Sequence, residues 1–120
     1  MARVEDKIKM MYGNAEHSLK ELIKNEDNLD SFDFFFIDAD KVNYDKYVEL
    51  ALLLLKRNGW IALDNVFAMG GVDTNDEDLS QHFRNYKHIM RRLNEKLHKN
   101  KNVHYNIVNI TDGLGLVIKK

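Results

Sequence analysis

Cysteine and proline are both absent from the 120 residues of this sequence. Without cysteine no disulfide framework forms, which is compatible with a reducing, cytoplasmic location. The opening residues, Met1 to Lys7, lack the apolar stretch of a signal peptide. The longest strongly apolar run, Val48 to Leu55, is far shorter than the ~20 residues that span a bilayer. We therefore expect no membrane segment.

An excess of charge is also absent, because the formal net charge is -1. We therefore expect no nucleic-acid partner, since no basic field covers the chain. The lysines and arginines between residues 84 and 101 are typical of the wet face of a helix. No repeat and no Pro-rich or Gly/Ser-rich linker divides the sequence. With 44% hydrophobic residues, residues 1–120 are expected to form a single domain with one core.

The most informative stretch is Phe32 to Ile37, a run of aromatic and β-branched side chains that stops at Asp38, Asp40 and Lys41. Such a run is typical of a parallel strand covered on both faces. In open α/β sheets, ligands bind beyond the carboxyl ends of such strands. The sequence thus predicts a buried strand with a functional site at its end.

A second apolar strand, Trp60 to Leu63, ends in the same way at Asp64 and Asn65. The helix predicted between the two strands is long enough for a right-handed crossover, so Asp38, Asp64 and Asn65 should lie together. Carboxylate and amide oxygens suit a hard cation such as Mg2+ or Ca2+. Zinc is disfavoured, since neither cysteine nor histidine is present at these ends.

The remaining patterns predict an α/β order of β-α-β-α-β-α-β-β, in which the last two strands form an antiparallel hairpin. The segment from Phe67 to Asp78, with two glycines, is expected to be a mobile loop over the strand ends. The other expected elements are a strand at 7–12, helices at 15–24, 44–56 and 79–97, and hairpin strands at 103–110 and 114–118.

These motifs together resemble the cation-dependent O-methyltransferases of the caffeoyl-CoA and catechol type. The resemblance rests on four short stretches, and it extends over essentially the whole chain from Val4. The hairpin entry departs from the family's Gly-Asp-Gly at one glycine. The stretches that carry the resemblance are Phe34 to Lys41, Asn43-Tyr44, Asp64-Asn65 and Asp112-Gly113.

The resemblance implies a Rossmann-like methyltransferase sheet, of which residues 1–120 match only the C-terminal half. The family places its Gly-rich cofactor loop and ribose-binding acid before the strand expected at Lys7, and neither occurs in this sequence. Without two strands that the family has in its N-terminal half, the strand before Asp38 has a long apolar edge, which must be covered by another chain or remain prone to aggregation. Because full-length relatives are usually dimers, a homodimer is the expected assembly.

The resemblance also implies a role for individual residues. Asp38, Asp64 and Asn65 would hold the divalent cation, Mg2+ or else Ca2+ or Mn2+, and Lys41 stands where catechol-type relatives keep a general base. Asp38 and Lys41 are thus the catalytic candidates. The residues implied in binding S-adenosylmethionine are Ala15, against the adenine, with Asp40 and Tyr47, and those implied in binding the acyl substrate are Arg84 and Tyr86.

The reaction implied is methyl transfer from S-adenosylmethionine to one of two vicinal hydroxyls of a small catechol-like or caffeoyl-CoA-like acceptor. A bound cation lowers the pKa of the attacking hydroxyl and fixes its position. Phe36, Phe67 and Met69 are the expected apolar walls of the site. Ala68 and Met69 stand where plant members carry Trp and Asn, so recognition of a phenylpropanoid does not follow from the resemblance at these two positions.

Other interpretations of the same residues stay open. Asp38 and Asp40 are also typical helix caps, Lys41 a typical solvated lysine, and Arg84 and Tyr86 typical structural residues. A strand ending in Asp-x-Asp also opens phosphatases of the haloacid-dehalogenase type, although Lys41 and the lack of a second acidic motif argue against them. A third possibility is a non-catalytic binding or dimerisation module.

Overall fold

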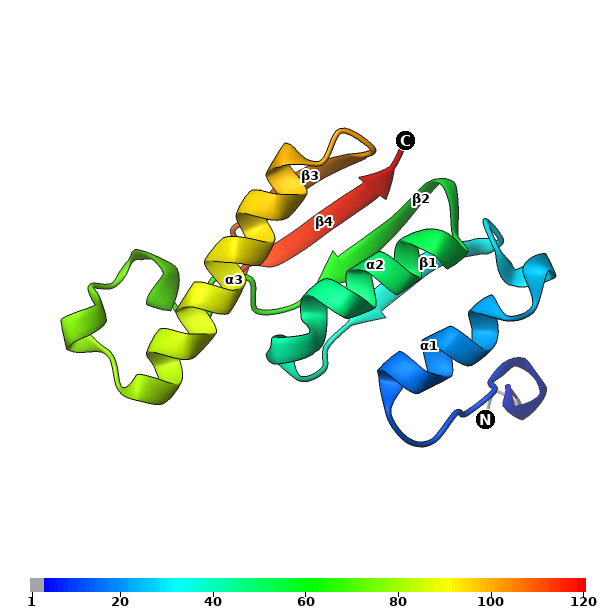
Figure 1. Cartoon of the computed structure of the whole chain (residues 1–120), viewed down its shortest axis with the longest axis horizontal. Coiled ribbons are helices and arrows are strands. Elements are labelled where there is room, and N and C mark those ends of the chain that lie inside the picture. Colours follow the sequence, from blue (N-terminus) through cyan, green and yellow to red (C-terminus); the bar gives the residue numbers. More distant parts are fainter. Residues whose placement is uncertain (1–3) are drawn as a thin grey trace.

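The computed structural model describes residues 4–120 as three α-helices and four strands, joined by short 3-10 turns (Figure 1). Residues 1–3, which belong to the opening segment considered above, lie outside the described residues. Within 4–120, no helix combines the length and apolar character that crossing a bilayer requires. The elements are α1 (Ala15–Ile23), β1 (Phe32–Ile37), α2 (Tyr44–Leu54), β2 (Leu55–Leu63), α3 (Gln81–Lys99), β3 (Val103–Val108) and β4 (Leu114–Lys119).

The four strands form one sheet in the order β1-β2-β4-β3. The pair β1 and β2 is parallel and is joined by α2, whereas β4 runs antiparallel to both β2 and β3. Ile37 pairs with Leu63, and Leu63 pairs with Gly115 on its other side. The predicted crossover and terminal hairpin are therefore confirmed. The register also brings the carboxyl ends of β1 and β2 to the same level.

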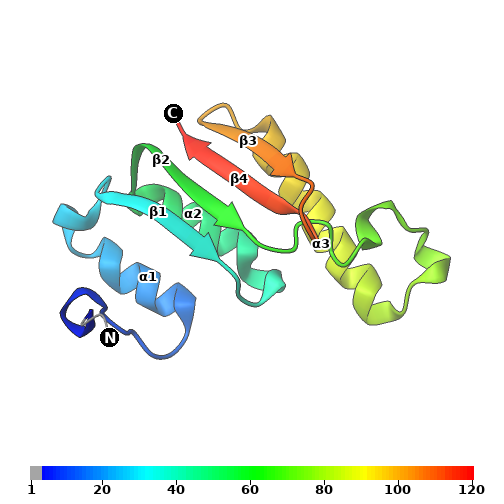
Figure 2. The ribbon, with the colours of Figure 1, turned by 180° about the vertical axis from the view of Figure 1, so that it is seen from behind.

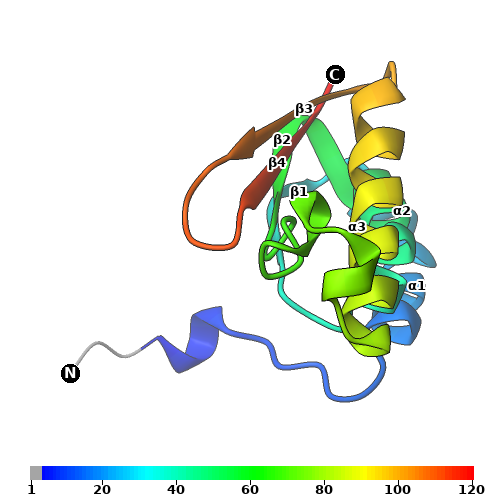
Figure 3. The same ribbon diagram turned by 90° about the vertical axis from the view of Figure 1, so that its left-hand side faces the viewer.

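All three helices lie on one side of the sheet (Figure 3). The core fills the space between this side and the helices, because alternate strand residues point toward them. Ile61, Leu63 and Val117 contribute from the strands, and each is completely buried. The helices contribute a larger buried set, which includes Val48, Ala51, Met90, Leu93 and Leu97.

No helix of the described chain covers the opposite side of the sheet, which faces the viewer in Figure 2. Phe34, Phe36 and Trp60 are 43%, 58% and 44% exposed. The prediction that the run from Phe32 is buried on both faces is therefore wrong, and only Ile37 of β1 is buried. The predicted apolar edge is confirmed, since β1 is the outermost strand of the sheet.

The strand expected at residues 7–12 is not formed. A 3-10 turn, Glu5–Lys7, is followed by irregular chain in which Ile8, Met10 and Tyr12 are exposed. The physical reason is that strand residues need a neighbouring strand to pair their backbone groups, and this segment lies beside no strand (Figure 3).

The helix expected at 44–56 also ends two residues early, because Leu55 adopts an extended conformation and begins β2. Asn58 then takes a left-handed conformation with φ of 63° inside the stretch that forms β2. The predicted turn at Asn58-Gly59 is therefore present, but it follows an extended residue and no longer terminates the helix.

Candidate functional site

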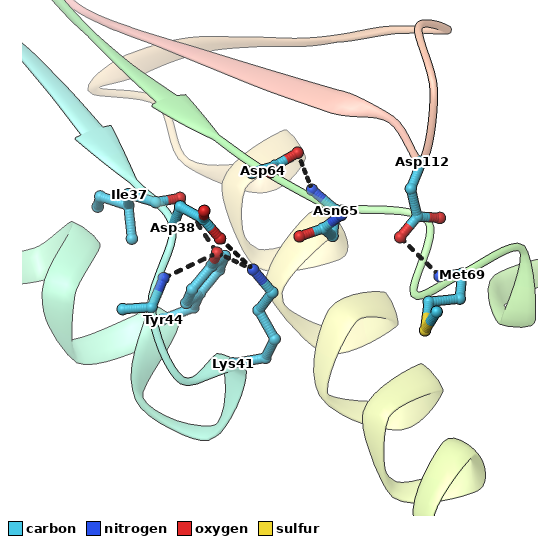
Figure 4. A network of polar contacts seen from close by, with 9 residues as sticks. Ile37, Asp38, Lys41, Tyr44, Asp64, Asn65, Met69 and Asp112 are labelled. Atoms are coloured by element: carbon cyan, nitrogen blue, oxygen red, sulfur yellow. Dashed lines mark hydrogen bonds and ion pairs between the residues drawn. The ribbon is translucent and has the colours of Figure 1, made fainter.

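The ends of β1 and β2 lie side by side, and the predicted cation ligands follow them directly. The amide of Asp64 donates to the carbonyl of Ile37 at 3.1 Å, and this bond holds the carboxyl ends of β1 and β2 together. Asp38 therefore leaves β1 next to Asp64 and Asn65, as the prediction required (Figure 4). The side chain of Asp38 is 55% exposed, so its carboxylate remains open to solvent or a ligand.

Lys41 is buried, with only 5% of its surface exposed. Its Nζ lies 3.3 Å from an oxygen of Asp38, donates to the hydroxyl of Tyr44, and sits 4.4 Å from the centre of the Tyr44 ring. A buried ammonium group needs such partners, because desolvation without them is costly. The interpretation of Lys41 as a solvated lysine is therefore wrong.

Tyr44 organises this turn through a fully buried side chain. Its hydroxyl donates to the carbonyl of Ile37 at 3.1 Å and accepts from the amide of Ala39 at 3.4 Å. Burial raises the pKa of the Tyr44 phenol, and the nearby carboxylates of Asp38 and Asp64 raise it further. The phenol thus stays neutral, and its hydroxyl holds the ammonium group of Lys41 in position by accepting a hydrogen bond from it. The Asn-Tyr of the family motif marked this residue, but the sequence alone suggested only an ordinary core aromatic.

Asp40 and Tyr47, the predicted cofactor contacts, are bonded to each other. The Tyr47 hydroxyl donates to Asp40 at 2.5 Å, and the amide group of Asn43 donates to the other carboxylate oxygen. The hydrogen bond from Tyr47 lowers the pKa of Asp40. The same bond, with a smaller effect of burial, raises the pKa of Tyr47 to about 12. Asp40 is therefore a fixed carboxylate at neutral pH.

A cavity of about 290 Å³ lies between α1 and β1 and reaches the end of the strand. Ala15, Asp38 and Tyr47 all line it, so the structure brings the predicted adenine neighbour and one predicted cofactor contact to a single cavity. The other lining residues are mainly apolar, with Leu19, Leu22, Phe35 and Ile37 among them.

A second cavity, of about 350 Å³, lies beyond the turn that follows β1. Lys41 and Tyr86 line it together, with Asp40 between this cavity and Tyr47. Val42, His82, Asn85 and Ile89 complete its lining. Arg84 is not among the lining residues, and its Nε donates to the carbonyl of Leu79 at 2.9 Å. The structure thus unites one of the two predicted substrate contacts with Lys41.

The chain after Asn65 forms a tight left-handed turn that docks on the β3–β4 hairpin. Asn65, Ala68 and Met69 have positive φ values of 59°, 52° and 56°. The carboxylate of Asp112 accepts from the amides of Met69 at 2.7 Å and Gly70 at 3.1 Å. Asp112 therefore holds the turn that carries Asn65, a role that the Asp-Gly motif alone did not disclose.

Further backbone bonds fasten the same turn. The amides of Val66 and Phe67 donate to the carbonyls of Gly113 and Asp112 at 3.1 and 3.0 Å. From α3, the side chain of Asn94 donates to the carbonyl of Val66 at 3.0 Å. The hydroxyl of Tyr105 in turn donates to Asn94 at 2.7 Å. The exit of β2 is thus fixed on two sides, which limits the movement of Asn65.

The three side chains expected as apolar walls of the site, Phe36, Phe67 and Met69, lie in different surroundings. Phe67 packs against Gly113, where an added Cβ would lie 2.7 Å from the ring. Phe36 belongs to the uncovered side of the sheet, and Met69 is largely exposed. The segment from Val72 to Asp76 is tied to α3, because Arg91 donates to the carbonyl of Val72 and Lys87 donates to Asp76. Its expected mobility stays a prediction.

The donor set at the strand ends fits a hard divalent cation in its chemistry. Asp38 and Asp64 supply two carboxylates and Asn65 an amide oxygen, which are the ligand types that Mg2+ and Ca2+ prefer. Among residues 4–120, no three carboxylates, imidazoles or thiols gather as a ready-made metal cluster. Water or an acceptor's oxygens would therefore have to complete the coordination.

Comparison with known proteins identifies the family. A family model described as O-methyltransferase matches residues 1–120. The chain is 36% identical over 128 residues to "Probable caffeoyl-CoA O-methyltransferase 3" of Dictyostelium discoideum, covering 99% of this chain and 51% of that protein. It is 37% identical over 116 residues to the caffeoyl-CoA O-methyltransferase of Pinus taeda, covering 96% of this chain and 45% of that protein.

Solved structures agree with this result. The SAH-bound methyltransferase PaMTH1 of Podospora anserina superimposes with a TM-score of 0.78 at 29% identity, covering 98% of this chain and 51% of that one. The chain spans about half the length of the relatives it matches. Sequence, sheet order and family match agree on one assignment. This chain belongs to the O-methyltransferase family and has the Rossmann-like α/β fold of its relatives.

Proposed function

We propose that this chain takes part in methyl transfer from S-adenosylmethionine to one of two vicinal hydroxyls of a small molecule, with a divalent cation at Asp38, Asp64 and Asn65. The observation that carries the proposal is the meeting of these three residues at adjoining strand ends. The two cavities that adjoin the Asp38 to Lys41 turn provide room for cofactor and acceptor.

The cavity of Ala15 and Tyr47 suits the cofactor. Its mainly apolar lining fits the flat adenine ring, and the fixed carboxylate of Asp40 lies next to Tyr47. Support comes from PaMTH1, whose solved structure holds SAH, the product that remains when S-adenosylmethionine has given up its methyl group. The hydrogen bond between Asp40 and Tyr47 would then hold both side chains in position to contact the cofactor.

The cavity of Lys41 and Tyr86 suits the methyl acceptor. Val42 and Ile89 offer apolar contacts, and His82 and Asn85 offer hydrogen bonds. A bound cation would supply Lewis acidity and a template for two adjacent hydroxyls. Lys41, which is held by Tyr44 and Asp38, would in its neutral amine form accept the proton that the attacking hydroxyl loses.

The phosphatase alternative receives no support from the family match. It requires Asp38 as a nucleophile with Asp40 as its acid/base partner. The carboxylate of Asp40 instead has both oxygens engaged, by Tyr47 and by Asn43. A carboxylate held in this way stays ionised and does not serve as a proton donor at neutral pH.

The test is calorimetric titration of the chain with S-adenosylmethionine and, separately, with Mg2+ or Mn2+. The Asp38→Ala, Asp64→Ala double variant should lose cation binding by at least about tenfold, because each carboxylate supplies a direct ligand. The matched control is the Asp73→Ala, Asp78→Ala double variant, which removes two exposed carboxylates from the loop before α3.

Equal cation affinity in the two double variants would contradict the assigned ligands. If the folded chain binds the cation but not S-adenosylmethionine, the cofactor assignment of Ala15 and Tyr47 fails for this chain. Turnover of a catechol in the presence of both ligands, lost in Lys41→Met, would support the acceptor assignment. Lys41→Met keeps most of the apolar stem and removes the ammonium group.

A further inference from the structure

The two strand ends that carry the candidate cation ligands are held in different ways. Asp38 has a side chain that is 55% exposed, so its carboxylate can adjust to a bound cation. Asn65 instead has a left-handed backbone conformation, with φ of 59°, at the start of the turn that follows β2. The amide of Asn65 donates to the carboxylate of Asp64 at 2.8 Å (Figure 4). Two of the three ligands therefore depend on the backbone of this turn.

Val66, the next residue, is where this backbone is held. It is completely buried, and an added Cβ at Gly115 would lie 2.9 Å from its side chain, so packing leaves it little room to shift. Its amide donates to the carbonyl of Gly113 at 3.1 Å. Its carbonyl accepts from the side chain of Asn94 on α3 at 3.0 Å. Because a buried carbonyl without a partner is costly, the bond from Asn94 fixes the turn from the helix side.

The side chain of Asn94 can take only one orientation in this position. The carbonyl of Val66 only accepts hydrogen bonds, so the NH2 group of Asn94 must face it and the amide oxygen must point the other way. That oxygen accepts from the hydroxyl of Tyr105 at 2.7 Å. Burial raises the pKa of the Tyr105 phenol, so its hydroxyl keeps the proton for this bond at neutral pH. Tyr105 therefore orients Asn94, and Asn94 holds Val66.

Mg2+ and Ca2+ differ in how strictly they require ligand positions. Mg2+ needs near-octahedral geometry at about 2.0–2.1 Å and keeps several waters, whereas Ca2+ accepts more oxygens at about 2.3–2.6 Å in flexible arrangements. Three protein ligands, two of them on a backbone held from two sides, with water in the remaining positions, suit Mg2+ better. If the turn is released, the affinity for Mg2+ should fall more than the affinity for Ca2+.

We propose that Asn94 and Tyr105 are positioning residues that make the candidate cation site select Mg2+ over Ca2+. They do so by holding the carbonyl of Val66 and, through it, the backbone that carries Asp64 and Asn65. Neither side chain is itself a ligand. The inference rests on the proposed function, because it takes the cation ligands from it, and it adds what decides between two cations of equal charge.

The test is calorimetric titration of the chain with Mg2+ and, separately, with Ca2+. Asn94→Leu removes the donor to Val66 with little change of side-chain volume, and should lower the affinity for Mg2+ by about tenfold, a loss typical when the support of metal ligands is removed. The affinity for Ca2+ should fall by about threefold or less, because Ca2+ tolerates displaced ligands. Tyr105→Phe removes only the hydroxyl that orients Asn94, and should shift the ratio of the two affinities in the same direction by a smaller factor.

The matched control is Lys96→Met on the same helix. The Nζ of Lys96 joins α3 to α2 through Asp45 and Glu49, at 2.6 Å from each carboxylate. The variant thus weakens a polar attachment of α3 two residues from Asn94 and leaves the bonds at the exit of β2 in place. It should bind both cations with the wild-type ratio of affinities.

The inference is wrong if the wild type prefers Ca2+, or if the folded Asn94→Leu and Tyr105→Phe variants keep the wild-type ratio. It is also wrong if Lys96→Met changes the ratio as much as they do. If Asn94→Leu fails to fold, Tyr105→Phe decides. These results leave the proposed function intact, because the Asp38→Ala, Asp64→Ala double variant would still lose both cations. A wild-type chain that binds neither cation would instead overturn the ligand assignment, and both proposals with it.

Discussion

The carboxyl end of β1 and the side of the sheet that no helix of the described chain covers, here called the open face, differ sharply in how their side chains are buried. Strand β1 contributes to both. At the strand end, Lys41 and Tyr44 are buried and their polar groups are bonded to named partners. On the open face, a few residues earlier, Phe34 and Phe36 extend into solvent. The difference teaches that this chain builds its polar site from its own contacts, whereas no helix of the described residues covers its apolar face.

The largest expected contrast lies between neighbours in β2. Ile61 is fully buried under the helices, so Ile61→Ala should lower the free energy of unfolding by about 3 kcal/mol through lost burial and a cavity. Trp60→Ala removes a larger side chain but one on the open face, and should cost about 1 kcal/mol or less. Urea unfolding followed by circular dichroism measures both. Equal losses would show that the face is covered in solution.

The hairpin that holds the site provides the next contrast. Gly113 and Gly70 both have positive φ, of 79° and 75°. A Cβ at Gly113 would lie 2.7 Å from the Phe67 ring, whereas nothing lies within 4 Å of one at Gly70. Gly70→Ala should cost about 1 kcal/mol from the backbone alone. Gly113→Ala should cost about 2 kcal/mol or more, because steric strain is added. Equal losses of unfolding free energy in the two variants, measured by urea unfolding, would mean that the hairpin shifts to relieve the contact with Phe67.

The third and smallest contrast is that between neutral and extreme pH in the effect of the bond between Tyr47 and Asp40. Tyr47→Phe should lower the free energy of unfolding by about 1 kcal/mol at neutral pH, since a hydrogen bond to a charged acceptor is lost. The pKa of Tyr47 is raised from 10.0 to about 12, so the bond stabilises fully below pH 10 and its contribution is lost toward pH 12.

At acid pH the contribution of the same bond is lost for the opposite reason, because Asp40 gains a proton there whereas Tyr47 loses one at alkaline pH. The pKa of Asp40 is lowered from its ordinary value of 3.8, so its contribution is present above that pH and is lost as the pH falls through the lowered pKa. The difference between wild type and Tyr47→Phe should thus be flat from pH 5 to 9 and shrink outside that range. A difference that persists at pH 12 would contradict this assignment. Leu53→Asp serves as a variant without effect on the bond.

The sequence predicted the elements whose patterns are local. The terminal hairpin, the helix before β2 and the meeting of Asp38 with Asp64 all follow from periodicity and from the crossover rule. The strand expected at residues 7–12 failed because a strand depends on a neighbour, which no local pattern reveals. Burial of β1 failed for the same reason, since its aromatic run is suited to a face that nothing in the described chain covers.

The candidate site shows the same division. Residue types and spacing identified Asp38, Asp64 and Asn65 as candidate oxygen ligands, and the family motif pointed to Lys41, Asp40 and Tyr47. The supporting contacts could not be predicted, because Asp112 reaches Met69 across 43 residues and Asn94 reaches Val66 across 28. Side chains that act through such distant partners carry no local signal. Arg84 is the opposite case. The resemblance implied that it contacts the substrate, but its side chain donates to the nearby carbonyl of Leu79.

The bond from Asp112 to the left-handed turn also bears on the order in which the molecule folds. A ribosome releases Asn65 and Met69 long before Asp112, which lies 43 residues after Met69. Until then the strained turn lacks the acceptor that holds it, and loop closure over this distance is comparatively slow. The exit of β2, with its share of the candidate cation site, takes its final form only when the last hairpin docks.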